Sequence, residues 1–206
     1  MKCNTVIRRV TLFLLIVVFA FAFMIVGCRK AVPQSTPAAS SDNADTKTHT
    51  ISKGLGDIIS KRRSWNPILM EFYGKAMPEF KITDITGKGH NLADYRGKNV
   101  MIVLWATWCR PCIEEIPHIM ALREIMPEDK LAILAISNEP SDVVKSMADD
   151  RNINYTVVSY KGVLPEPFSS IRGYPSTFFI KPDGTLKLVV EGGASLGEFK
   201  SIILAE

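Results

Sequence analysis

Cys109 and Cys112, separated by two residues, are the first feature of this sequence that indicates chemistry. The other two cysteines, Cys3 and Cys28, lie near the N-terminus. A disulfide that stabilises a fold usually closes a longer loop, and a zinc site needs four ligands, commonly two such pairs or one pair with histidines. The three histidines of the chain are scattered, so no metal site is expected. The pair therefore predicts dithiol–disulfide redox chemistry.

The residues around the pair place it between a strand and a helix. Residues 100–104 form an apolar run of strand type, and a helix is expected to begin at the cysteines. Cys109 is expected to be the exposed nucleophile, because N–H groups and the positive dipole end at a helix start stabilise a thiolate. Cys112, one turn further, is expected to resolve the mixed disulfide. Arg110 adds a nearby positive charge, and Pro111 suits the first turn, where a missing N–H costs nothing.

Two glutamates follow the pair, and their spacing distinguishes them. Glu115 lies three residues after Cys112 and shares its helix face, whereas Glu114, two residues after it, does not. Glu115 is therefore the expected acid–base group for the Cys112 thiol. The alternative is that both carboxylates only complement the start of the helix.

Two tryptophans flank the site. Trp108 directly precedes Cys109 and is expected to shield the thiols and to contact the substrate. Trp105, at the end of the apolar run, is expected to lie in the core. His118 lies six residues after Cys112 and points away from it on a helix, so a Cys–His pair is not expected.

Residues 1–27 have the composition of an export signal. Basic residues precede an uncharged apolar run over residues 10–26. The run ends at Gly27-Cys28, which resembles the lipobox of bacterial lipoproteins, so Cys28 is the expected lipidation site. The alternative is an uncleaved anchor helix, because the 18 residues 10–27 could just span a bilayer. Either way, the rest of the chain is expected to be membrane-anchored in the cell envelope, outside the cytoplasm.

Without residues 1–27 the chain is nearly neutral. They contain three of the 25 basic residues and none of the 21 acidic ones, which leaves 22 basic against 21 acidic side chains. No stripe of lysine and arginine is present in the sequence, so nucleic acid is not an expected partner.

Residues 28–75 are expected to be a tether and linker. Residues 31–53 are rich in Pro, Ser, Thr, Ala, Asp and Asn and lack apolar periodicity, which is typical of a solvated segment. Residues 51–74 contain several large apolar side chains and are expected to form a helical turn or two docked on the domain.

Residues 76–206 alternate strand and helix patterns, which is typical of a layered α/β or α+β domain. Strands are expected near residues 80–85, 100–105, 131–137, 155–159, 177–180 and 186–191. Helices are expected from the cysteines to about residue 125 and over residues 141–150, 168–171 and 196–204. The turn segments 86–89 and 181–184 are expected to connect hairpins.

This sequence resembles the thioredoxin superfamily, and more narrowly the membrane-anchored TlpA and ResA type. The resemblance covers about residues 76–206 and rests on residues 77–80, 94–98, 104–112, 115, 117, 173–180 and 183–184. It implies a single α/β domain of thioredoxin-like fold. That fold has a central mixed β-sheet flanked by helices, an N-terminal β-hairpin extension and an insertion over residues 141–158.

The resemblance also implies roles for single residues. Pro175 matches a cis-proline that lies beside the cysteines in this family, and a proline here must start its strand because it would break a ladder in mid-strand. The backbone of Tyr174 is then available to pair with an extended substrate segment. A glutamate at the place of Glu115 takes the role of the buried acid of classical thioredoxins, for which this chain has Val103. An ordinary trans-proline turn is the alternative for Pro175.

The implied reaction is dithiol–disulfide exchange with protein substrates by a monomer that needs no metal and no dissociable cofactor. A membrane thiol protein is expected to donate or accept the electrons. The family leans towards reductases, and some members serve cytochrome c maturation. The Arg110-Pro111 dipeptide departs from the acidic-Pro pair common among those members, which puts heme-protein substrates in doubt.

Two other functions compete with this one. A peroxiredoxin-type thiol peroxidase shares the fold, but such enzymes place a threonine three residues before the peroxidatic cysteine, whereas Thr107 is two before Cys109. A non-catalytic module that binds peptides in the cis-proline groove with idle cysteines is the other. Loss of activity on replacement of Cys109 by serine distinguishes an enzyme from such a module.

Overall fold

The computed structural model describes residues 57, 60–61 and 66–205. The expected export signal, the expected lipidation site Cys28 and most of the expected tether lie outside the described residues. Within the described part of the chain, no helix is long and apolar enough to cross a membrane.

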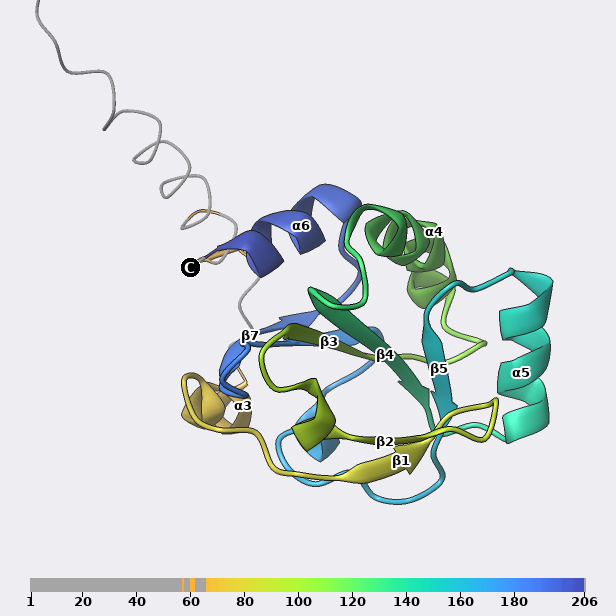
Figure 1. Ribbon diagram of the computed structural model, residues 1–206, viewed down its shortest axis with the longest axis horizontal. Helices are drawn as coiled ribbons and strands as arrows, with labels where there is room; N and C mark the ends of the chain where they lie inside the picture. Colours follow the sequence, from red (N-terminus) through yellow and green to blue (C-terminus); the bar gives the residue numbers. More distant parts are fainter. Residues whose placement is uncertain (1–56, 58–59, 62–65, 206) are drawn as a thin grey trace, which may run out of the picture. The chain divides into compact units, whose positions relative to one another are not determined.

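A five-stranded mixed sheet with the order β5-β4-β3-β6-β7 forms the centre of the domain (Figure 1). Its strands are β3 (Asn99–Leu104), β4 (Leu131–Ser137), β5 (Thr156–Ser159), β6 (Ser176–Ile180) and β7 (Leu186–Glu191). β3, β4 and β5 are parallel, whereas β6 runs antiparallel to β3 and β7 antiparallel to β6. The expected central mixed sheet is confirmed.

Both faces of this sheet are covered, which explains why its central strands are continuous apolar runs in the sequence. The helices that line one face are α4 (Arg110–Ile125), α5 (Ser141–Asp150) and α6 (Leu196–Leu204). Alternate residues of β3 belong to the two cores: Met101 and Val103 to the core under these helices, Ile102 and Leu104 to the other. The predicted ends of all three helices agree with the structure within one residue.

The other face is covered by shorter elements. They are α3 (Pro67–Phe72), the hairpin of β1 (Lys81–Thr83) and β2 (Gly89–Asn91), and the 3-10 helices η1 (Leu92–Tyr95) and η2 (Phe168–Ser170). Leu69 of α3 is fully buried in this core, and the side chain of Asn66 donates a hydrogen bond of 2.6 Å to the carbonyl oxygen of Ser170. α3 and its contacts agree with the helical turn docked on the domain that was expected within residues 51–74.

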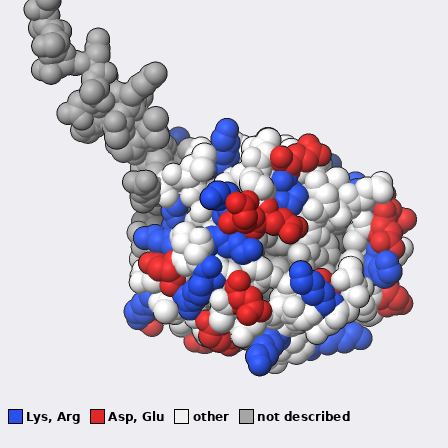
Figure 2. Space-filling model, in the orientation of Figure 1, with Lys and Arg blue, Asp and Glu red and all other residues white. Residues whose placement is uncertain are grey.

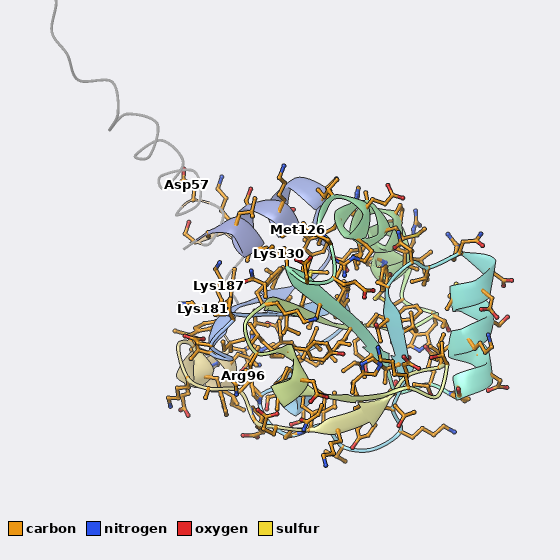
Figure 3. The ribbon with its side chains drawn as sticks, viewed as in Figure 1. Asp57, Arg96, Met126, Lys130, Lys181 and Lys187 are labelled. Carbon is orange, nitrogen blue, oxygen red and sulfur yellow. A yellow bond between two sulfur atoms is a disulfide. The ribbon has the colours of Figure 1, made fainter. Side chains whose placement is uncertain are left out.

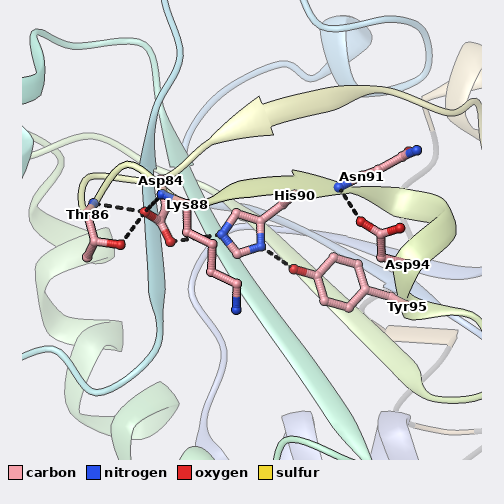
Figure 4. Close-up of polar contacts among 7 residues, drawn as sticks. All are labelled: Asp84, Thr86, Lys88, His90, Asn91, Asp94 and Tyr95. Carbon is pink, nitrogen blue, oxygen red and sulfur yellow. Dashed lines mark hydrogen bonds and ion pairs between the residues drawn. The ribbon is translucent and has the colours of Figure 1, made fainter.

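A buried polar chain anchors the β1–β2 hairpin (Figure 4). His90 on β2 hydrogen-bonds Tyr95 through Nδ1, and its Nε2 lies 2.8 Å from Oδ2 of Asp84. The other oxygen of Asp84 accepts bonds from Thr86 and from the backbone N–H of Lys88. Burial by itself raises the pKa of Asp84, but the bonds from Thr86, His90 and Lys88 outweigh it and lower this pKa to about 2.

We expect Asp84→Asn to destabilise the protein near neutral pH. The lowering of the Asp84 pKa from 3.8 to about 2 corresponds to about 2 kcal/mol of folding free energy that the charged carboxylate contributes. Because the pKa is depressed in the folded state, this stabilisation is present above the unfolded pKa of about 4 and is lost as the pH falls towards 2. Urea denaturation of both proteins at several pH values measures it. The exposed Asp129→Asn is the control, and a difference that stays constant with pH would contradict the expectation.

The turn between β6 and β7 requires a glycine. Gly184 has a positive φ of 82°, and a Cβ there would overlap the guanidinium of Arg96. Arg96 donates to the carbonyl oxygen of Asp183 and pairs with Glu79 at 3.0 Å.

Figure 3 shows Arg96 on the side of the domain where Lys181 and Lys187 also lie. On the face shown in Figure 2, basic and acidic side chains are interspersed.

Candidate active site

The two cysteines form a disulfide at the start of α4. Cys109 is the N-cap residue of the helix, and Cys112 lies in its first turn, with an S–S distance of 2.09 Å. The Cys109 sulfur accepts a hydrogen bond of 3.3 Å from the backbone N–H of Cys112. This N–H of the first turn thus points at the sulfur that would carry the thiolate after reduction, which favours the charged form.

The expected exposure of Cys109 is wrong for this oxidised state. Cys109 is 5% exposed and Cys112 is 3% exposed, so the two differ little. The physical reason is the bond itself, which holds the Cys109 sulfur against the first turn and within the same core cluster as Cys112. A protein substrate must therefore reach a recessed disulfide.

Arg110 contributes less to the site than expected. Its side chain is 89% exposed and forms an ion pair of 2.9 Å with Glu114, the i+4 neighbour on the outer face of α4. An exposed pair of this kind is worth little, and the glutamate offsets the positive charge that Arg110 was expected to bring to the thiolate. Pro111 occupies the first turn, as expected.

Glu115 lies on the buried side of α4 together with Cys112, as its spacing predicted. The residue is 2% exposed, and its Oε1 accepts a hydrogen bond of 2.8 Å from the backbone N–H of Ala194, in the loop before α6. Burial raises the pKa of Tyr155, and the nearby negative charge of Glu115 raises it further. Glu115 thus fastens α4 to a distant loop from inside the core, a contact that the sequence did not suggest.

Pro175 lies next to the end of the strand that leads to the cysteines. The Tyr174–Pro175 peptide bond is cis, and Pro175 directly precedes β6, as expected from the resemblance. β6 pairs with β3 so that Ser176 lies opposite Leu104, which brings the proline beside the loop that contains Cys109. The ring of Tyr174 contacts Trp108 edge to face, with 6.0 Å between the ring centroids.

The two tryptophans have opposite environments, and the expected core position of Trp105 is confirmed. Trp105 is 3% exposed, whereas Trp108 is 71% exposed at the surface beside the disulfide. Tyr174 also lines a cavity of 190 Å³, together with Leu104, Ile136, Asn138, Tyr160, Gly162, Val163, Leu164, Phe168, Ser169 and Ile171. None of these lining side chains is charged. Tyr174 therefore contacts Trp108 and also lines a cavity without charged side chains.

Glu139, which contacts the loop before Cys109, was not predicted from the sequence. Glu139 follows β4, and its two carboxylate oxygens accept hydrogen bonds from Thr107 at 2.6 and 2.7 Å. Thr107 is two residues before Cys109, but 32 residues separate it from Glu139, so no local spacing could pair them. The parallel order of β3 and β4 was the available signal, because the carboxyl ends of parallel strands meet at one edge of a sheet.

The described residues include no group of three or more histidine, cysteine or acidic side chains that could hold a metal ion. A larger cavity of 490 Å³ lies against the β1–β2 hairpin and is lined by none of the expected site residues.

Comparisons with known proteins agree with this geometry. Residues 73–189 match the AhpC/TSA family. A thiol-disulfide oxidoreductase ResA from Geobacillus kaustophilus is 32% identical over 120 residues, which cover 58% of this chain and 69% of that protein. A ResA from Oceanobacillus iheyensis is 30% identical over 151 residues, 71% of this chain and 78% of that protein. Among solved structures, a thiol:disulfide interchange protein of the thioredoxin family from Chlorobium tepidum is 27% identical, with a TM-score of 0.56 over 62% of this chain and 92% of its own.

Proposed function

Because this chain belongs to the AhpC/TSA family and is a thiol-disulfide oxidoreductase, we propose that Cys109 and Cys112 exchange a disulfide with protein substrates outside the cytoplasm. The observation that carries the proposal is the Cys109–Cys112 disulfide at the N-terminus of α4, beside cis-Pro175. A reducible bond, a helix N-terminus and the start of β6 thus lie close together, which supports the proposal.

The reaction has two steps. The Cys109 thiolate attacks one sulfur of the substrate disulfide, forming a mixed disulfide and releasing the other substrate sulfur as a thiolate, which takes up a proton. Cys112 then loses its proton and attacks the Cys109 sulfur, which releases the second substrate cysteine and closes the Cys109–Cys112 bond. Two electrons pass to the substrate, and the reverse sequence oxidises a substrate dithiol.

The substrate segment binds as an extended strand at the backbone of Tyr174. In recognition of this kind the backbone supplies main-chain hydrogen bonds, while adjacent pockets select side chains. Trp108 is 71% exposed and contacts Tyr174, so both rings can pack on the segment that carries the substrate cysteine. Arg110 and Pro111 lie exposed in the first turn of α4 and complete this surface.

Glu115 serves the second step. Cys112 must lose its proton while 3% exposed, and burial disfavours a thiolate. Glu115 lies on the same side of α4, one turn further along, and is the acid–base group we assign to that proton.

The direction we favour is reduction, with electrons supplied by a membrane thiol protein. The support is the resemblance to ResA-type proteins, and cytochrome c maturation is one process that such a reductase could serve. The N-terminal sequence, with its apolar run and Cys28, supports export and attachment of the domain to a membrane by a lipid.

The proposed function is tested by mixing the reduced wild-type protein with a protein disulfide, such as insulin, and separately with hydrogen peroxide. We expect rapid oxidation of the Cys109–Cys112 pair by the protein disulfide and slow oxidation by peroxide. Faster reaction with peroxide would favour a thiol peroxidase, and no reaction with either would favour a peptide-binding module.

The lipid attachment has its own test. We expect Cys28→Ser to abolish labelling of the protein by a radioactive fatty acid in cells, because the thiol that would be lipidated is lost. Disulfide exchange by the purified protein is expected to stay unchanged, because the reacting cysteines lie in the folded domain. Labelling that persists in the variant would leave an uncleaved anchor helix as the better account.

A further inference from the structure

Glu139 links the active-site loop to the edge of the sheet. Its Oε2 accepts from the backbone N–H of Thr107 at 2.6 Å, and its Oε1 accepts from the Thr107 hydroxyl at 2.7 Å. The hydroxyl of Ser137, the last residue of β4, also donates to Oε2 at 3.0 Å. Both oxygens of one carboxylate are thus committed to a fixed arrangement, and hydrogen bonds to a charged acceptor are the stronger kind.

Glu139 itself is held from two strands. Its backbone N–H donates to the Ser137 hydroxyl at 3.2 Å, and the hydroxyl of Ser159, at the end of β5, donates to its carbonyl oxygen at 2.7 Å. The carboxyl ends of β3, β4 and β5 therefore meet at this residue. A carboxylate anchored in this way can hold a neighbouring loop without moving itself.

The loop between β3 and α4, residues 105–109, depends on this contact. The backbone N–H of Trp105, its first residue, donates to the carbonyl oxygen of Ile136 in β4 at 3.1 Å. Within the loop, the backbone N–H of Cys109 donates to the carbonyl oxygen of Ala106 at 3.2 Å. Between these two bonds, the backbone N–H and the hydroxyl of Thr107 both donate hydrogen bonds to the carboxylate of Glu139. In the oxidised protein the disulfide also holds the end of the loop, but reduction removes that bond.

We propose that Glu139 is a positioning residue that keeps the loop 105–109 in place, so that Cys109 stays at the N-cap of α4 after the disulfide opens. The inference rests on the proposed function, in which the Cys109 thiolate attacks the substrate. The N-cap position matters because the thiolate is stabilised by the helix N-terminus, and this effect falls off within the first turn. A displacement of about 1 Å from the reactive geometry can cost up to about 10²-fold in rate.

The location of Glu139 fits this role. Burial raises the pKa of Tyr174, and the negative charge of Glu139 raises it further, so the carboxylate lies near the other wall of the substrate site. Glu139 therefore supports the loop from the side on which the substrate strand would bind. Within the described part of the chain, its carboxylate forms no hydrogen bond with either cysteine sulfur.

Two substitutions separate position from charge. In Glu139→Gln the side-chain oxygen can still accept from the Thr107 N–H, and the new amide group can donate to the Thr107 hydroxyl. In Glu139→Ala both bonds are lost. Because both variants remove the negative charge, a difference between them reports the loss of the side chain and its hydrogen bonds, not the loss of charge.

The experiment measures alkylation of Cys109 by iodoacetamide against pH in the reduced protein, and the kcat and KM for reduction of insulin. For Glu139→Ala we expect alkylation to begin at higher pH than for Glu139→Gln, and kcat to be about 10-fold or more lower with a smaller change in KM. Glu139→Gln is expected to remain within about threefold of the wild type, because it keeps the geometry. Thr107→Val, which removes only the hydroxyl bond, is expected to fall between the two.

Asp142→Ala is the matched control, because it removes an exposed carboxylate from the first turn of α5, three residues after Glu139. Equal alkylation profiles and equal kcat for the alanine and glutamine variants would overturn the proposal. So would an alanine variant that unfolds at lower temperature but keeps the wild-type alkylation profile. If the wild type did not reduce insulin, the proposed function would fail, but the alkylation profiles would still decide the role of Glu139.

Discussion

Replacing Cys109 by serine is expected to abolish disulfide exchange. A serine hydroxyl is not ionised near neutral pH and cannot take the place of the thiolate, so no mixed disulfide can form. The fold should persist, because the site is a recessed position at the N-cap of α4, where serine is a favourable residue. Stopped-flow fluorescence measures the exchange, since the exposed Trp108 lies directly before Cys109 and contacts Tyr174.

Cys28→Ser is the control for this substitution, because it makes the same chemical change at a cysteine 81 residues earlier in the sequence. It is expected to exchange at the wild-type rate when purified. Residual exchange by Cys109→Ser at more than a trace of that rate would mean that Cys112 can attack substrates itself, and the assignment of the two cysteines would be wrong.

The second large effect is expected for Glu115→Gln. Resolution of the mixed disulfide needs a proton acceptor for Cys112, and Glu115, 2% exposed on the same side of α4, is the group assigned to it. Glutamine keeps the volume and can still accept the hydrogen bond from Ala194, so the loop before α6 should stay in place. We expect the attack by Cys109 to be unchanged and the resolving step to slow by about 10²-fold or less.

The two steps are separated by stopped-flow kinetics at several pH values. The defect of Glu115→Gln should shrink as the pH rises, because a larger fraction of the Cys112 thiol is then ionised without a general base. Glu114→Gln is the matched control, since Glu114 is exposed on the outer face of α4 and paired with Arg110. Equal rates for the two variants would show that Glu115 only fastens α4 to the loop at Ala194.

The parts of the fold that follow from local patterns could be predicted from the sequence. α5 and α6 have the predicted ends, because an apolar face at helical spacing and, for α6, the capping pair Ser195 and Glu198 define them. The cysteines at the start of α4 were predicted in the same way, from an apolar run that passes directly into Cys-x-x-Cys.

The parts that were missed depend on contacts between residues far apart in the sequence. Glu139 reaches Thr107 across 32 residues and Glu115 reaches Ala194 across 79, and both contacts exist only once the sheet and its helices are assembled. The exposure of Cys109 was predicted from its place at a helix end, but the disulfide moves its sulfur into the core. The bonds of His90 to Asp84 and Tyr95 likewise need the register of the β1–β2 hairpin.

The central claim is that Cys109 forms the bond to a protein substrate and Cys112 releases it, and trapping tests this most directly. Reduced Cys112→Ser protein is mixed with a protein disulfide, and the adduct is digested and analysed by mass spectrometry. We expect a stable mixed disulfide that joins Cys109 to a substrate cysteine, because the resolving thiol is absent. Failure of any adduct to form, while the wild type is oxidised by the same substrate, would contradict the assignment of Cys109 as the attacking thiol.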